Sequence, residues 1–146
     1  MYEQFYELKM KVIPIYAEAG ISGFESPAAE YTELSLSLDE LLITHPNATF
    51  IGVANGDSMQ GVGIFDGDLL IVDRSETTTQ GDIVVANYNG NFVCKIIDKQ
   101  RKQLLSASAK HRPVSISDAD EFQIEGVVTR SVRLHRKSRE LLSCLL

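Results

Sequence analysis

The dipeptide Asn89-Gly90 lies between two short apolar segments, and it limits the possible folds more than any other feature of the sequence. Asn-Gly favours the two-residue turn, with positive φ at both positions, that joins antiparallel strands. The flanking segments, residues 82–88 and 91–97, are rich in valine and isoleucine, as strands are. The sequence therefore predicts a β-hairpin over residues 82–97.

Further short strands are expected on both sides of this hairpin. Apolar residues that alternate or run together predict strands at residues 49–54, 69–72, 104–105, 114–116 and 122–128. A helical turn opened by Asp39 is expected at the end of the apolar segment 34–43. Short strands at close spacing, with little sustained helix, predict a compact, mostly β fold.

The first part of the chain has a different character. Pro14 interrupts any long helix, and residues 17–29 are mainly small residues and glycines gathered before Pro27. Such a segment is expected to be extended or flexible, and so accessible to a peptidase site, although an ordinary linker would have the same composition. We therefore predict an N-terminal arm at residues 1–31 and a folded domain with a C-terminal tail at residues 32–146.

Ser58 is a candidate nucleophile because it lies between a Gly-Asp pair and Gly61. A serine needs a neighbouring base, and no histidine is an obvious one. Lys95 lies in the predicted strand 92–97, of which both faces are apolar, and desolvation of a lysine favours its neutral, basic form. Two ordinary interpretations remain open: Gly-Asp-Ser is a common turn or helix start, and an edge-strand lysine can extend to water. The hypothesis is a serine/lysine dyad.

The overall composition excludes several other classes. A net charge of −6 argues against an extended nucleic-acid surface, and the basic run at residues 130–139 is read as a solvated strand end rather than a DNA-facing patch. No apolar run is long enough for a membrane span or a secretory signal, so a cytoplasmic location is expected. Cys94 and Cys144 are expected to be free thiols, and the three histidines lack ligand spacing. Neither a metal nor a cofactor is predicted.

Several separated blocks of the sequence resemble one known family. Together they resemble the UmuD-like group of the LexA-type serine/lysine peptidases, whose members are self-cleaving subunits of error-prone DNA polymerases. The resemblance covers most of the chain, from about Gly23 to Val128. Its blocks are residues 23–31, 45–49, 56–59, 66–73, 81–84 and 126–128.

The resemblance implies a role for each candidate site residue. It implies that Ser58 is the nucleophile, that Lys95 is the general base, and that the backbone amides of Asp57 and Ser58 form the oxyanion hole. The implied substrate is the protein's own arm. The scissile bond maps onto Ser22-Gly23, and Ala19-Gly20 is the alternative because it has the usual residue pair in a less well-aligned place.

The sequence departs from the family pattern at two positions. Ser22 stands where alanine or cysteine is usual before the scissile bond, and Val93 stands where a threonine often orients the lysine. Self-cleavage slower than the family's, or a binding module with the same fold that cleaves poorly, would follow from these changes. A signal-peptidase-like enzyme acting on other proteins is a third possibility, against which the lack of a membrane anchor argues.

The resemblance also implies partners. It implies that a RecA filament on single-stranded DNA stimulates cleavage in the SOS response, and that the shortened protein, as a homodimer, joins a UmuC-like translesion polymerase. Only about two dozen residues precede the expected bond, fewer than a helix-turn-helix domain needs. Direct sequence-specific DNA binding is therefore not expected.

Overall fold

The computed structural model describes residue 17 and residues 37–136. The chain divides into two units, residues 1–44 and 45–146. The described part of the first unit contains one short helix, α1 (Leu38–Leu42), which begins after Ser37 because the Ser37 side chain accepts a hydrogen bond from the Glu40 N–H at 3.2 Å. The predicted helical turn is present one residue earlier than expected. Most of the predicted arm lies outside the described residues.

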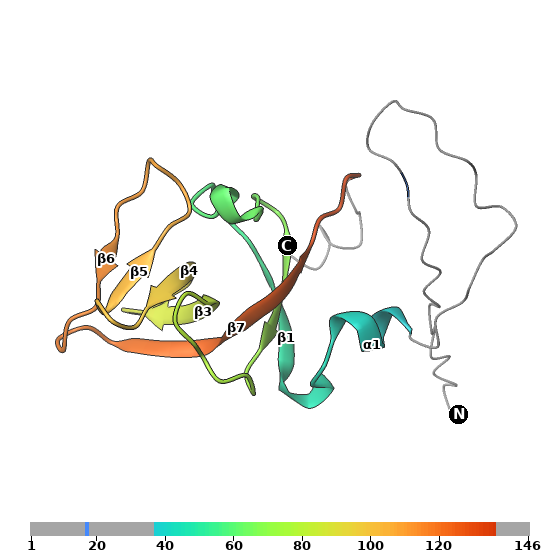
Figure 1. Cartoon of the computed structure of the whole chain (residues 1–146), viewed down its shortest axis with the longest axis horizontal. Coiled ribbons are helices and arrows are strands. Elements are labelled where there is room, and N and C mark those ends of the chain that lie inside the picture. The colour runs from blue at the N-terminus through green and yellow to red at the C-terminus, as the bar shows by residue number, and fades with distance from the viewer. Residues whose placement is uncertain (1–16, 18–36, 137–146) are drawn as a thin grey trace, which may run out of the picture. The chain divides into compact units, whose positions relative to one another are not determined.

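The second unit is built on one antiparallel sheet of seven strands (Figure 1). The strand order is β1-β2-β7-β3-β4-β5-β6. Between residues 45 and 136 the helical content of the unit is limited to two 3₁₀ turns, η1 (Pro46–Ala48) and η2 (Gln60–Val62). The predicted mostly β class is confirmed. The strands are β1 (Thr49–Val53), β2 (Leu69–Asp73), β3 (Ile83–Tyr88), β4 (Asn91–Asp98), β5 (Gln103–Leu105), β6 (Val114–Ser115) and β7 (Phe122–Val132).

The long strand β7 joins the two halves of the sheet. Its first half pairs with β3 and its second half with β2, and both pairings contain a register shift, at Val85/Ala86 and at Ile71/Val72. Such irregularities bend a strand and increase its twist. Figure 1 shows β7 crossing the whole unit. This crossing places the β1 side of the sheet, with the loop that follows β1, within reach of β4 and β5.

The predicted hairpin is present as β3 and β4. Asn89 and Gly90 have φ values of 51° and 86°, the two positive values that the expected turn requires. The six pairs between the strands run from Tyr88 opposite Asn91 to Ile83 opposite Ile96. The hairpin therefore fixes the register of β4, and with it the position of Lys95.

Both faces of β4 are packed against apolar residues, as the sequence predicted. Cys94 and Ile96 lie against one core cluster, and Val93 and Ile97 belong to the other. The first cluster is built from Ala54, Met59, Ile64, Leu70, Val72 and Val85, and the second from Val84, Ala86, Ile97 and Leu104. The strand that carries Lys95 therefore lies between two apolar core clusters.

Asp68 attaches the end of β7 to the loop before β2. Its side chain is only 2% exposed, and both carboxylate oxygens accept hydrogen bonds at 2.9 Å from Arg133. A third bond comes from the Phe65 N–H at 2.8 Å, and the guanidinium lies 4.2 Å from the centre of the Phe65 ring. The Arg133 guanidinium lowers the pKa of Asp68. One member of the predicted basic run, the exposed Arg133, is thus the ion-pair partner of a buried carboxylate.

Candidate active site

Ser58 lies in the loop between β1 and η2, which is fixed on both sides of the serine. Before it, the Gly56 N–H donates to the Asp66 carboxylate at 2.8 Å, and after it, the Met59 side chain is buried in the first core cluster. The Asp57 carboxylate contacts the His111 ring at 2.8 Å, and this hydrogen bond lowers the pKa of Asp57. The half-buried serine therefore lies in a turn whose two sides are held by specific contacts.

The backbone amides of Asp57 and Ser58 were the predicted oxyanion donors. Within residues 37–136, neither N–H group donates to another residue, although the Asp57 N–H also contributes to lowering the pKa of its own carboxyl group. Such donors are available to a negative charge that develops beside the serine hydroxyl. The position of both amides in the nucleophile's own loop is compatible with that role.

Lys95 is half-buried on β4, and its amine has a specific partner. The Nζ atom donates to the Ser106 hydroxyl oxygen at 2.8 Å. Burial lowers the pKa of Lys95, because removing water destabilises the ammonium form. The amine therefore has a defined protein partner, and β4 lies between β3 and β5 rather than at an edge of the sheet.

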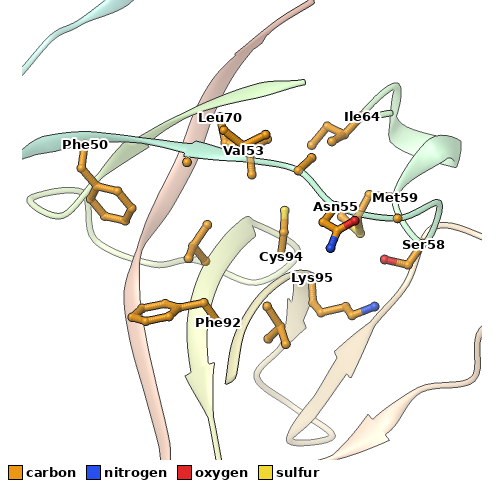
Figure 2. A pocket seen from close by; sticks show the side chains of 15 residues that line it. Phe50, Val53, Asn55, Ser58, Met59, Ile64, Leu70, Phe92, Cys94 and Lys95 are labelled. Carbon is orange, nitrogen blue, oxygen red and sulfur yellow. The ribbon is translucent and has the colours of Figure 1, made fainter. Parts of the chain in front are cut away.

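Ser58 and Lys95 line the same cleft, which has a volume of about 460 Å³. Figure 2 shows the serine hydroxyl and the lysine amine at one end of this cleft, with Phe50 and Phe92 toward the other end. Among the described residues, the two polar groups share no direct hydrogen bond. Catalytic hydrogen bonds are often long before substrate binds and shorten in the reacting complex. The remaining lining is mostly apolar.

Cys94 also lines the cleft, beside Lys95. Burial raises the pKa of its thiol to about 11, so the sulfur is protonated at neutral pH. A thiol is a much weaker nucleophile than a thiolate. The prediction of a free core cysteine holds for Cys94, whereas Cys144 lies outside the described residues.

The sequence did not predict a cluster formed by His45, Asp73 and Glu76. Their potential ligand atoms lie within 4.8 Å of one another. The buried Asp73 carboxylate already accepts bonds from the Ser75 N–H and hydroxyl and contacts the His45 ring at 2.6 Å. These bonds, those of Ser75 first, lower the pKa of Asp73 to about 2, and the contact raises the pKa of His45. The cluster connects the segment before β1 to the end of β2.

The comparison with protein-family models places the chain in one family. Residues 14–129 match the family described as Peptidase S24-like, which covers well over half of the sequence. The mostly β sheet agrees with that assignment. The chain belongs to the Peptidase S24-like family.

Curated relatives narrow the assignment to UmuD-like proteins. The chain is 40% identical to protein SamA of Salmonella typhimurium strain LT2 over 86% of this chain and 88% of that protein. It is 39% identical to protein ImpA of Salmonella typhimurium over 88% of each. The similarity to the LexA repressor of Alteromonas mediterranea is lower, 33% over 73% of this chain and 52% of the repressor.

Sequence reasoning missed Ser106, the partner of Lys95. The signal for it lies in strand pairing, because Ile96 is opposite Leu105 and Ile97 is opposite Leu104. Continuing this antiparallel register by one step places Ser106 opposite Lys95.

The predicted cleavage positions lie outside the described residues; they are Ser22, Gly23, Ala19 and Gly20. In the described part of the chain, no helix has the length and apolar character needed to cross a membrane.

Proposed function

We propose that this protein is a serine/lysine autopeptidase that removes its own N-terminal arm, residues 1–31, by cutting within it. The observation that carries the proposal is the shared cleft, in which a loop serine and a desolvated lysine lie at the same end. Membership of the Peptidase S24-like family supports the peptidase class. The arm is tethered to the site, so orientation replaces affinity for a separate substrate.

In the proposed reaction the neutral Lys95 amine accepts the proton of the Ser58 hydroxyl. The serine oxygen then attacks the carbonyl carbon of Ser22, and the amides of Asp57 and Ser58 stabilise the negative charge on the carbonyl oxygen. The Lys95 ammonium returns the proton to the nitrogen of Gly23 as the peptide bond breaks. Water, deprotonated by the same lysine, then hydrolyses the ester between Ser58 and Ser22.

The proposed cellular role follows from the UmuD-like relatives. The shortened protein acts in SOS mutagenesis as a homodimeric accessory subunit of a UmuC-like translesion polymerase, after a RecA filament on single-stranded DNA has stimulated cleavage. Sequence-specific DNA binding by this chain itself is not part of the proposal. The net charge of −6 agrees with a protein partner rather than a DNA target.

The departures at Ser22 and Val93 favour a second candidate, a UmuD-like regulatory binding module that does not cleave. Intact mass spectrometry separates the two. Purified protein is incubated at alkaline pH, and separately with RecA, ATP and single-stranded DNA. We expect one shortened species whose mass corresponds to cleavage at Ser22-Gly23. A mass that corresponds to cleavage at Ala19-Gly20 would instead assign the scissile bond to that pair. An unchanged mass under both conditions would favour the binding module.

The rate of self-cleavage should depend on pH through Lys95. Because burial lowers its pKa, the amine loses its proton below the usual lysine range, and only the neutral form accepts the serine proton. We expect the rate to rise about tenfold per pH unit on the acidic side of that pKa and to level off above it. The measurement is the single-turnover rate between neutral and alkaline pH, and a flat profile would contradict the role of Lys95.

A further inference from the structure

The Lys95 amine is held by a residue that follows β5. Ser106 is half-buried, and its hydroxyl oxygen accepts the hydrogen bond from Lys95 Nζ at 2.8 Å. The position two residues before the lysine is Val93, which lies on the same face of the strand and has no polar atom. In the described part of the chain, Ser106 is the one side-chain hydrogen-bond partner of the amine.

The next residue binds the loop that contains Ser58. The Ala107 N–H donates to the Ser58 carbonyl at 2.7 Å, and the Ala107 carbonyl accepts from the Gly61 N–H, also at 2.7 Å. Ser106 and Ala107 therefore connect the lysine on β4 to the serine loop after β1. Leu104, two residues before Ser106, is only 2% exposed and anchors this segment in the second core cluster.

We propose that Ser106 is the positioning residue of the serine/lysine pair: it holds the Lys95 amine toward Ser58, while Ala107 fixes the serine loop to the same segment. This inference rests on the proposed autopeptidase function. A neutral amine has two N–H bonds and one lone pair, and donating one N–H to Ser106 limits the directions in which the lone pair points. Residues with an orienting role of this kind affect rate through geometry.

Positioning and simple electrostatics predict opposite results for Ser106→Ala. A hydroxyl that accepts from the ammonium stabilises the charged form, so removing it lowers the pKa of Lys95 and leaves more neutral amine at neutral pH. If proton availability alone mattered, cleavage at neutral pH would accelerate. Positioning predicts instead that the maximal rate at alkaline pH falls about tenfold or more, because the amine is neutral there in both proteins.

The experiment measures single-turnover self-cleavage of the full chain against pH in four variants. Ser106→Ala should show the lower alkaline maximum, with its midpoint moved to lower pH, and Ser106→Thr should retain most of the wild-type rate. Adding Val93→Thr to Ser106→Ala should restore part of the rate, because the threonine places a hydroxyl on the face of β4 that carries Lys95. Ser108→Ala removes a hydroxyl from the same segment and should cleave like wild type.

Different results would overturn the inference and the proposed function. If Ser106→Ala keeps the wild-type alkaline maximum while Ser58→Ala is inactive, Ser106 does not position the lysine, but the autopeptidase stands. If wild type does not cleave at all, the autopeptidase falls. The contact between Ser106 and Lys95 is then tested by following the titration of Lys95 by NMR in the uncleavable Ser58→Ala chain. Adding Ser106→Ala to that chain should lower the pKa of Lys95. An unchanged pKa would refute the contact between Ser106 and the lysine amine.

Discussion

Replacing Ser58 or Lys95 by alanine is expected to reduce self-cleavage at least about a thousandfold, because the two groups act as a unit in one proton transfer. For the same reason the double variant should be no slower than either single variant. Ser58 is half-buried in a loop held by Gly56, Met59 and Ala107, so its alanine variant should keep the fold. The measurement is the yield of shortened chain by intact mass, with far-ultraviolet circular dichroism to verify folding.

The matched control for this prediction is Cys94→Ala. Cys94 lines the same cleft and is the other potential nucleophile, but its thiol, with a pKa of about 11, stays protonated. We expect cleavage within a few fold of wild type. Loss of cleavage in Cys94→Ala, together with survival in Ser58→Ala, would transfer the nucleophilic role to the cysteine.

Gly61→Ala is expected to disrupt the attachment of the serine loop to the end of β5. A Cβ atom at this position would lie 2.5 Å from the Ala107 carbonyl oxygen and 3.2 Å from the Ala107 Cβ. Backbone cannot yield as a flexible side chain does, so the loop and the strand must separate. We expect about 1–3 kcal/mol of destabilisation and, because Ser58 moves relative to Lys95, a loss of about a hundredfold in cleavage.

Chemical denaturation and the cleavage assay together test this prediction. Gly52→Ala is the control for stability, since its Cβ would lie 3.9 Å from the Leu70 Cβ, which is an ordinary contact. That variant should unfold within about 0.5 kcal/mol of wild type. A Gly61→Ala protein with wild-type stability and wild-type cleavage would show that the contact with Ala107 does not fix the serine loop.

Local sequence patterns predicted most of the strands because each depends on neighbouring residues. The turn at Asn89-Gly90 and the strands that it joins came from local turn chemistry and apolar content. The end of β7 was not predicted by local patterns. It continues to Val132, beyond the predicted residue 128, because pairing with β2 keeps a polar stretch, Thr129 to Ser131, in the sheet. Pairing between distant strands is invisible to a local pattern.

The sequence by itself identified Ser58 and Lys95 as candidates and the apolar surroundings that lower the pKa of the lysine, since both follow from residue type and alternation along one strand. Only the tertiary structure decided that Ser106 is opposite Lys95 and that Ala107 binds the serine loop. These contacts join segments that are far apart in the chain. Their register is set by the pairing of β4 with β5 and by the course of β7, which bring together groups that no local pattern relates.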